Sequence, residues 1–261
     1  MTDLGPLLQI AGAALDQAST LVTEMAVGAV RPKGDRDMVS EIDLAVEDRV
    51  RSFLQKETPE IGFLGEENGG TGINGPLTWA LDPVDGTANL VNGLPLCAVS
   101  LGLVEHNRSV LGAIDLPFMR HRFRAAEGNG AYADDEPIQT SRTEALNEAI
   151  VAIGDYAVGA RAQERNVRRL ALTRLLAEQV LRVRMLGSAA IDLVWVASGK
   201  LDASIALSNH PWDMAAGVAI AREAGAVVMD LDGSAHSLRS TATIAVAPGL
   251  KDEVLQLLQT L

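Results

Sequence analysis

The sequence contains a single cysteine, Cys97, among 261 residues. One cysteine excludes an intrachain disulfide and any zinc site built from several thiolates. It lies in the apolar string 96–99, which predicts a buried thiol on a strand. No run of 18 apolar residues is present, and the first residues carry no basic segment of the kind that opens a secretory signal. We therefore expect a cytoplasmic protein that does not bind membranes.

Basic residues are scarce relative to acidic ones. The chain has 22 Lys and Arg against 34 Asp and Glu, a net charge of -12. Such a charge repels polyanions, so nucleic acid is not an expected partner. Apolar residues at 48% and charged residues at 21% are typical of a folded globular protein, either one large domain or two small ones. If several of these carboxylates lie close together, they should require bound cations.

The first half of the chain reads as two helices followed by a sheet. Apolar residues three and four apart predict a helix over residues 8–25, and Pro32, Gly34 and several charges predict a loop over 31–37. Ser40 and Asp43 predict a capped second helix that reaches residue 55. Short apolar runs then predict strands at 61–64, 78–81, 98–104, 110–114 and 122–126.

From residue 141 onward, predicted helices and strands alternate. Ser141 and Glu144 match a capping box and predict a helix start. Further helices are predicted at 161–178, 188–198, 212–224 and the C-terminal end, with strands at 149–153, 181–186, 202–206, 226–229 and 242–247. We therefore expect an α+β half at residues 1–140 that supplies most of a metal site, and an α/β half at 141–261 that completes the substrate site.

The most informative motif begins at Asp82, where an apolar strand is expected to end in a proline-containing turn. Asp82 and Asp85 can converge on one cation, with the Val84 carbonyl left free to face it. The N–H groups of Gly86 and Thr87 open a short predicted helix and would meet an anion there. A plain β-turn is the alternative interpretation of this motif.

Two further motifs carry acids at the ends of predicted elements. Glu66 and Glu67 follow a strand, so one can bind a cation while the other holds a water or a second cation. Asp213 begins a helix rich in small residues. Taken alone, the glutamates would be a solvated turn, and Asp213 would be a helix cap or a partner of the helix dipole.

Together these strings resemble the signatures of the inositol monophosphatase family, within the lithium-sensitive, magnesium-dependent phosphatase superfamily. The resemblance covers most of the chain and rests on the order and spacing of residues 39–43, 65–67, 82–89, 187–190, 212–217 and 223–226. It implies an α/β fold, a layered αβαβα sandwich, and a homodimer. It also implies Mg²⁺-dependent hydrolysis of a small phosphorylated metabolite by metal-activated water.

The resemblance also implies a role for each motif residue. One Mg²⁺ would be held by Glu66, Asp82 and the Val84 carbonyl, a second by Asp82, Asp85 and Asp213, and a third by Glu66 with waters, with Glu67 as a supporting acid. Thr87, linked to Asp43, and Glu66 would orient and deprotonate the attacking water. Gly86 and Thr87 would bind the phosphate, and Asp85, Gly187, Ser188 and Ala189 would contact the alcohol. Alternatively, Asp43 is only a first-turn helix acid and Ser188 only a helix cap.

One position departs from the family pattern. Many inositol phosphatases carry a Glu seven residues before the last motif Asp, where this sequence has Ala206, whose side chain accepts no hydrogen bond. Ser208 or His210 could substitute for it. The charged loop with Lys33 lies where relatives have a mobile segment over the metals.

The sequence therefore predicts a phosphatase, with inositol 1-phosphate as the first candidate substrate. A histidinol-phosphate, sugar-phosphate or 3′-phosphonucleotide phosphatase is the same-class alternative, and a non-catalytic metal-binding scaffold is the different-class one. Residues 70–75 formally match a dinucleotide-binding glycine pattern, but Pro76 and an apparent strand follow where a helix is required, so we interpret them as a turn.

Overall fold

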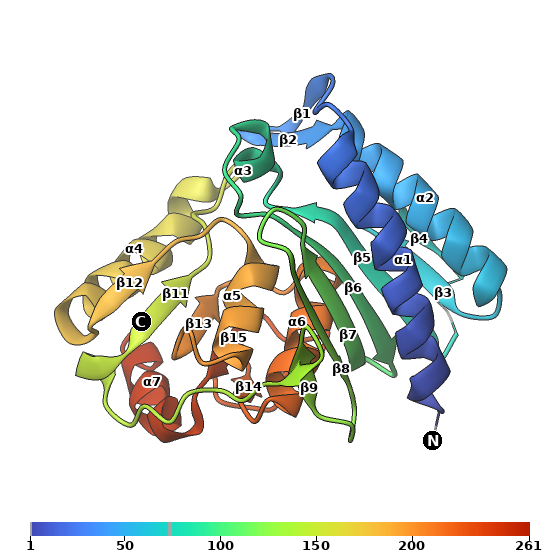
Figure 1. Ribbon diagram of the computed structural model, residues 1–261. Coiled ribbons are helices and arrows are strands. Elements are labelled where there is room, and N and C mark those ends of the chain that lie inside the picture. Colours follow the sequence, from blue (N-terminus) through green and yellow to red (C-terminus); the bar gives the residue numbers. More distant parts are fainter. Residues whose placement is uncertain (1, 73–74) are drawn as a thin grey trace.

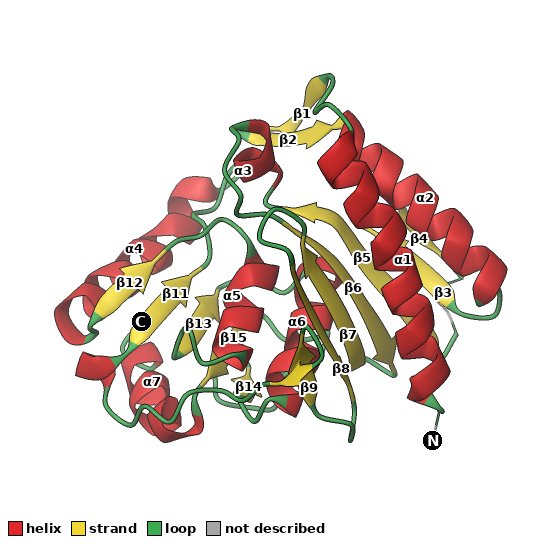
Figure 2. Ribbon diagram, in the orientation of Figure 1, coloured by secondary structure: helices red, strands yellow, loops and turns green. Residues whose placement is uncertain are grey.

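The computed structural model describes residues 2–72 and 75–261, and within them the chain forms five layers (Figure 1). Helices α1 (Leu4–Glu24) and α2 (Glu41–Glu57) cover the outer face of an eight-stranded sheet. Helices α5 (Ala189–Ala197) and α6 (Pro211–Glu223) lie between it and a five-stranded sheet. Helices α4 (Ala162–Gln179) and α7 (Lys251–Leu258) complete the far side (Figure 2). The predicted αβαβα sandwich is confirmed.

The larger sheet is built entirely from the first half of the chain. Its order is β10 (Glu136–Pro137), β9 (Ala131–Ala133), β8 (His121–Ala126), β7 (Arg108–Leu116), β6 (Ala98–Glu105), β5 (Leu77–Asp85), β3 (Gly62–Gly65), β4 (Gly69–Thr71). Strands β3 and β5 run parallel, so their carboxyl ends meet at one edge. All other neighbours in this sheet are antiparallel.

The smaller sheet comes from the second half of the chain. Its order is β12 (Arg182–Arg184), β11 (Ile150–Ile153), β13 (Ala203–Ala206), β15 (Thr243–Val246), β14 (Val227–Met229). Strand β11 pairs in parallel with both β12 and β13. The boundary at residue 140 falls between the two sheets and stays a prediction.

Helix α6 joins the two halves, because it packs on the larger sheet although it follows the strands of the smaller one. A Cβ atom on Gly102 of β6 would lie 2.6 Å from the Ala216 nitrogen, and one on Gly112 of β7 would overlap the Ala216 carbonyl. Glycine on these strands and alanine on the helix therefore allow a close approach. No helix in the described part of the chain is both long and apolar enough to cross a membrane.

The loop predicted over 31–37 is wrong, because this segment forms a hairpin. Strands β1 (Val30–Gly34) and β2 (Asp37–Ser40) pair antiparallel, with Arg36 in the left-handed region at the turn. Pro32 is accommodated because β1 pairs on one side only, with β2. Proline and charge signals indicate a break in the core pattern, but they do not exclude an exposed two-stranded ribbon.

Two other local predictions are corrected. Strand β5 does not end at Asp82 but continues to Asp85, with an irregular register between them that accommodates the proline. The capping box at Ser141 is absent, because its hydroxyl donates to Asp202 at 2.6 Å and the next helical turn begins at Leu146. Of the turn predicted over 70–75, Gly70 and Thr71 belong to β4, and residues 73–74 lie outside the described residues.

Candidate active site

Four acids from three elements meet where β3 and β5 end. Asp82 and Asp85 lie in the irregular last part of β5, Glu66 follows β3, and Asp213 lies in the first turn of α6. Because β3 and β5 are parallel, their ends bring Glu66 and the two aspartates to the same edge of the sheet. Helix α6 brings Asp213 to this edge from the second half of the chain.

Burial and mutual repulsion dominate the electrostatics of this cluster. Asp82 is 3% exposed, and its pKa is raised well above the ordinary range by burial and by the nearby Glu66, Asp85 and Asp213. The pKa of Asp213 is also raised well above its ordinary value by burial, Asp85 and Glu66, against the attraction of Lys33. Two like charges about 4 Å apart cost about 4 kcal/mol at an effective dielectric near 20. The cluster therefore needs protons or bound cations.

Asp85 is fixed in place by the beginning of α5. Its Oδ2 accepts hydrogen bonds from Ser188 Oγ at 2.9 Å and from the Ala190 N–H at 2.5 Å. Burial raises the pKa of Asp85 to about 6, although these bonds act in the opposite direction. Ser188 Oγ also accepts from the Ile191 N–H at 3.2 Å, so Ser188 is a helix cap as well as a partner of Asp85.

Asp43 likewise makes two contacts, one with the start of α2 and one with Thr87. Its fully buried carboxylate accepts the Ser40 N–H at 2.9 Å, which completes the predicted capping box of α2. Its other oxygen lies 2.8 Å from Thr87 Oγ, which is also 3.0 Å from the Val84 carbonyl. The Thr87 hydroxyl therefore occupies one of the two acceptor positions of the Val84 carbonyl, and the role of this carbonyl as a metal ligand stays a prediction.

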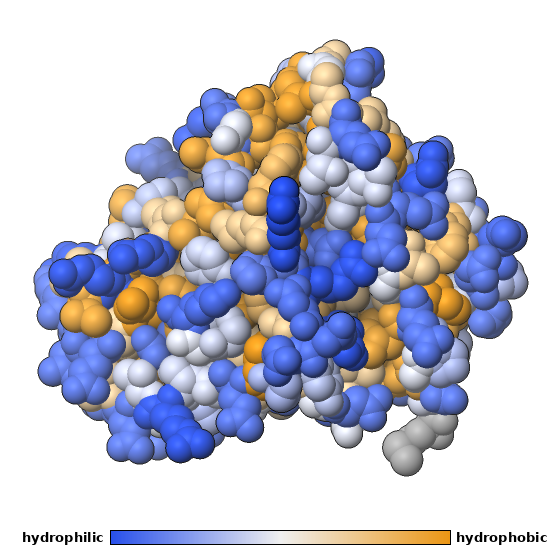
Figure 3. Space-filling view, in the orientation of Figure 1, coloured by the Kyte–Doolittle hydropathy of each residue, from blue (hydrophilic) through white to orange (hydrophobic). Residues whose placement is uncertain are grey.

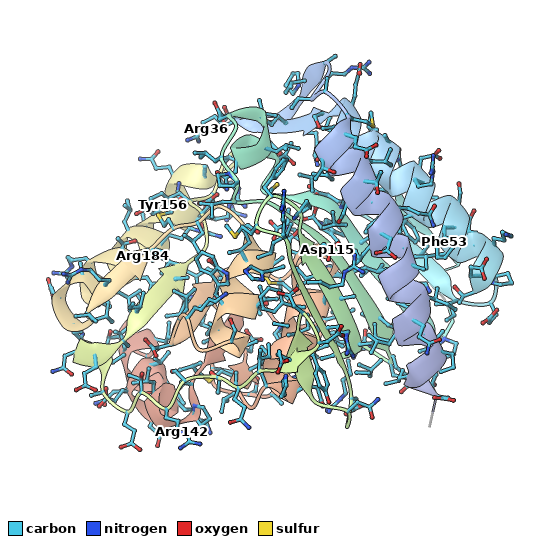
Figure 4. The ribbon with its side chains drawn as sticks, viewed as in Figure 1. Arg36, Phe53, Asp115, Arg142, Tyr156 and Arg184 are labelled. Atoms are coloured by element: carbon cyan, nitrogen blue, oxygen red, sulfur yellow. The ribbon has the colours of Figure 1, made fainter. Side chains whose placement is uncertain are left out.

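Lys33 spans the two glutamates of the second motif. Its Nζ lies 2.7 Å from Glu66 Oε1 and 2.8 Å from Glu67 Oε1. Burial and the charge of Glu66 raise the pKa of Glu67 to about 7, which outweighs the attraction of Lys33. At the turn of the hairpin, Asp35 Oδ2 accepts the Gly159 N–H at 3.3 Å. The hairpin therefore links Glu66 and Glu67 to the second half of the chain, and its Arg36 lies beside α3 (Thr87–Val91) in Figure 4.

Glu47 is a site-supporting residue that the sequence analysis missed. Its fully buried carboxylate accepts the Glu67 N–H at 2.8 Å and the Asn68 N–H at 3.0 Å, and pairs with Arg51 at 2.6 Å. Gly65 has no side chain because a Cβ there would overlap this carboxylate. A signal was present in the sequence, since Glu47 lies between Val46 and Val50 on the core-facing side of the predicted helix.

The segment predicted to bind phosphate, residues 86–87, lies against the segment predicted to contact the alcohol, residues 187–189. Gly86 has a φ of +97°, and a Cβ there would be 2.7 Å from the Leu96 carbonyl and 3.2 Å from the Gly187 carbonyl. Asn89 Nδ2 donates to the Leu96 carbonyl at 2.7 Å and to the Leu186 carbonyl at 2.8 Å. The start of α3, where N–H groups lack helical acceptors, is thus held beside residues 187–189.

The donor set is compatible with a magnesium ion. All of its ligating atoms are oxygens, its carboxylates repel one another, and Lys33 already places a cation between Glu66 and Glu67. In the arrangement that the described residues adopt, no group of three His, Cys, Asp or Glu side chains forms a ready-made site for one ion.

The side of the site near Ala206 has few polar groups. Ala206 is 6% exposed at the end of β13. His210 is exposed, and its ring stacks on Trp212 with centroids 5.3 Å apart. The exposed His210 does not take the place of a buried carboxylate, and the substitution by Ser208 stays a prediction.

Comparison with known proteins identifies a family and several similar proteins. The Inositol monophosphatase family matches residues 4–261. The chain is 37% identical over 259 residues to the inositol-1-monophosphatase ImpA of Mycolicibacterium smegmatis, covering 98% of this chain and 93% of that protein. It is 34% identical to a fructose-1,6-bisphosphatase/inositol-1-monophosphatase of Thermotoga maritima, covering 85% and 83%.

Solved structures show the same architecture. An inositol monophosphatase of Anabaena superposes with a TM-score of 0.90 at 29% identity, covering all of this chain and 98% of that one. The suhB protein of Bartonella henselae also gives 0.90 at 29% identity, covering 98% and 99%. The chain therefore belongs to the inositol monophosphatase family and is a phosphoric monoester hydrolase.

Proposed function

We propose that this chain hydrolyses a small phosphate monoester with Mg²⁺, with inositol 1-phosphate as the first candidate. The observation that carries the proposal is the cluster of Glu66, Asp82, Asp85 and Asp213 beside the start of α3. Burial and mutual repulsion raise the pKa of each of the three aspartates, a condition that divalent cations relieve. Asp82, Asp85, Asp213 and Glu66 would hold two ions, with the Val84 carbonyl as a further ligand, and Glu66 with waters would hold a third.

When bound, Mg²⁺ supplies an acidified water and neutralises charge on the phosphate and the leaving oxygen. Thr87, whose hydroxyl lies 2.8 Å from an Asp43 carboxylate oxygen, and Glu66 would be the residues that orient that water and accept its proton. The N–H groups of Gly86 and Thr87 bind the phosphate oxygens at the positive end of α3. Asp85, Gly187, Ser188 and Ala189 contact the alcohol, with Asp85 fixed by α5.

A sugar phosphate is the second candidate. Relatives from Thermotoga maritima and Aquifex aeolicus, at 34% and 35% identity, are named as both fructose-1,6-bisphosphatase and inositol-1-monophosphatase. Ala206 presents only a methyl group to the alcohol, so the pocket selects weakly for inositol hydroxyls.

Phosphate release with and without Mg²⁺ tests both candidates. The panel is inositol 1-phosphate, fructose 1,6-bisphosphate, histidinol phosphate and adenosine 3′,5′-bisphosphate. We expect Mg²⁺-dependent release, fastest from inositol 1-phosphate. Preferential turnover of fructose 1,6-bisphosphate would favour the second candidate, and no release from any ester would favour a non-catalytic scaffold.

We also propose that two copies of the chain associate. Apolar side chains are exposed around α4, β12 and the loop after α3, at Leu94, Val167, Leu170, Leu181 and Met185. Figure 3 shows apolar residues gathered over the upper part of the face, above α3. Sedimentation should give twice the chain mass, and Leu170→Glu with Met185→Glu should give the monomer. A monomeric wild type would contradict this proposal.

A further inference from the structure

The loop that joins β13 to α6 is held by a cluster of polar side chains. Asn209, in this loop, uses both ends of its side-chain amide. Its Nδ2 donates to the Ser237 carbonyl at 3.0 Å and to the Ser240 carbonyl at 2.9 Å. Its Oδ1 lies 2.9 Å from His236 Nε2 and accepts the Thr243 hydroxyl at 3.2 Å. We call Asn209, His236 and Thr243 the polar cluster.

The bonding of Asn209 determines which ring nitrogen of His236 carries the proton. Because Asn209 Nδ2 donates to two carbonyls, its Oδ1 faces His236 Nε2, so Nε2 is protonated and donates. His236 is 4% exposed, and burial and the charge of Arg222 lower its pKa to about 4, against the charge of Asp230. The ring is therefore neutral at pH 7 and acts as a fixed donor toward the loop.

The segment that carries His236 is anchored to α6 and to the larger sheet. The His236 carbonyl accepts from Arg222 Nη2, in the last turn of α6, at 2.6 Å. Leu238 donates its N–H to the Asn107 carbonyl, in the turn between β6 and β7, at 2.9 Å. The polar cluster therefore fastens the loop before α6 to a segment whose position is set by α6 and by the larger sheet.

Asp213 lies directly beyond this loop. The His210 carbonyl accepts the Met214 N–H at 3.2 Å, which closes the helical turn that contains Asp213. The close packing of α6 on the larger sheet involves Ala215 and Ala216, which come after Asp213. This packing fixes the body of the helix, whereas the first turn also depends on the loop that enters it.

We propose that Asn209 and His236 are positioning residues that keep Asp213 in place for Mg²⁺ binding. The inference rests on the proposed function and extends the support of its metal site to residues outside the acidic motifs. Arg169 donates to the Leu207 carbonyl at 2.9 Å, but this contact lies at the end of the loop next to β13. It therefore does not replace a contact made closer to Asp213.

Calorimetric titration with Mg²⁺, without substrate, tests this assignment. His236→Phe keeps an aromatic ring and removes the donor, so we expect the Kd for Mg²⁺ to rise about 10-fold. His236→Gln restores a donor close to the position of Nε2, so its Kd should stay within about 3-fold of wild type. A purely structural role would lower Tm and leave the Kd of the folded protein unchanged.

His121→Phe is the matched control, because it makes the same exchange at an exposed histidine on β8. It should bind Mg²⁺ as the wild type does. An unchanged Kd in folded His236→Phe, or an equal loss in His236→Gln or His121→Phe, overturns the inference and leaves the proposed function intact. A wild-type protein that binds no Mg²⁺ overturns the proposed function itself.

A measurement on the wild type decides the question if His236→Phe does not fold. In ¹⁵N spectra, Mg²⁺ should shift the resonance of His236 Nε2–H, because the ring is linked to the turn that carries Asp213. Asp213→Asn should abolish this shift. A resonance that does not respond to Mg²⁺ in the wild type, or that shifts equally in Asp213→Asn, contradicts the positioning role.

Discussion

The two sides of the site differ in how completely their polar groups are bonded. On the side formed by β3, β5 and α2, the carboxylates of Asp43, Glu47 and Asp85 each accept at least two hydrogen bonds. On the side formed by β11, β13 and α5, Ala206 has no polar side-chain atom and Asp192 Oδ1 is unbonded within the described residues. We call the first region the bonded side and the second the sparsely bonded side, and we propose that the first carries the reaction chemistry and the second the choice of substrate.

The largest effect should come from Asp82, the most central acid of the bonded side. Asp82→Asn should lower Mg²⁺-dependent kcat by about 10³-fold or more, because it removes a ligand shared by two proposed ions. Phosphate release at saturating Mg²⁺ measures this effect. Turnover within a few fold of wild type would show that the two-metal assignment is wrong.

Glu47 should have the next largest effect, through the loop that carries Glu66 and Glu67. In Glu47→Gln, one of the two oxygens that accept the Glu67 and Asn68 N–H groups is replaced by an amide. We expect a 10- to 100-fold weaker apparent Mg²⁺ affinity, typical of residues that support metal ligands.

Asp48→Asn is the matched control for Glu47. It makes the same change of charge one residue further along α2, at an exposed position. Mg²⁺ titration of activity should leave this control at the wild-type affinity. Equal shifts in both variants would indicate a general charge effect rather than positioning of the loop.

Ala206 tests the sparsely bonded side. Ala206→Glu should raise kcat/KM for inositol 1-phosphate relative to fructose 1,6-bisphosphate by about 5- to 10-fold, because it adds an acceptor for alcohol hydroxyls. The comparison is made within one variant, so differences in active fraction cancel. An unchanged ratio would mean that the missing Glu does not explain substrate choice.

The smallest expected effect is on stability without metal. The pKa values of about 6 for Asp85 and about 7 for Glu67 lie above the ordinary values near 4. Between pH 4 and pH 7 the folded state therefore binds more protons than the unfolded state, and the free energy of unfolding falls as pH rises. With EDTA, Tm should be about 2–6 °C lower at pH 8 than at pH 5.5, and Mg²⁺ should remove the difference. A Tm that rises with pH in EDTA would contradict these assignments.

The sequence predicted the bonded side far better than the other side. Its acids lie in short strings with fixed spacing to strand ends and helix starts, so Asp82, Asp85 and Asp213 could be identified without coordinates. Glu47 was missed although it lies on the core-facing side of the predicted helix, because the backbone N–H groups that it accepts at residues 67 and 68 carry no sequence signature.

The same distinction holds for the fold. Amphipathic periodicity predicted α1, and periodicity with a capping pattern predicted α2, because the apolar faces of both helices pack on the larger sheet. The β1–β2 hairpin was missed because its exposed strands bury little and pair only with each other. The false helix start at Ser141 matched a local pattern, whereas the hydroxyl bonds Asp202, which is 61 residues away.

The position of α6 has a consequence for how the chain folds during synthesis. All strands of the larger sheet emerge from the ribosome before residues 211–223, so the inner faces of β5, β6 and β7 are uncovered until α6 appears. Gly102 and Gly112 fit only a small-residue helix, so other segments cover them poorly in the meantime. The nascent chain therefore presents an apolar sheet surface of the kind that chaperones protect, and a ribosome stalled before residue 211 would release an aggregation-prone product.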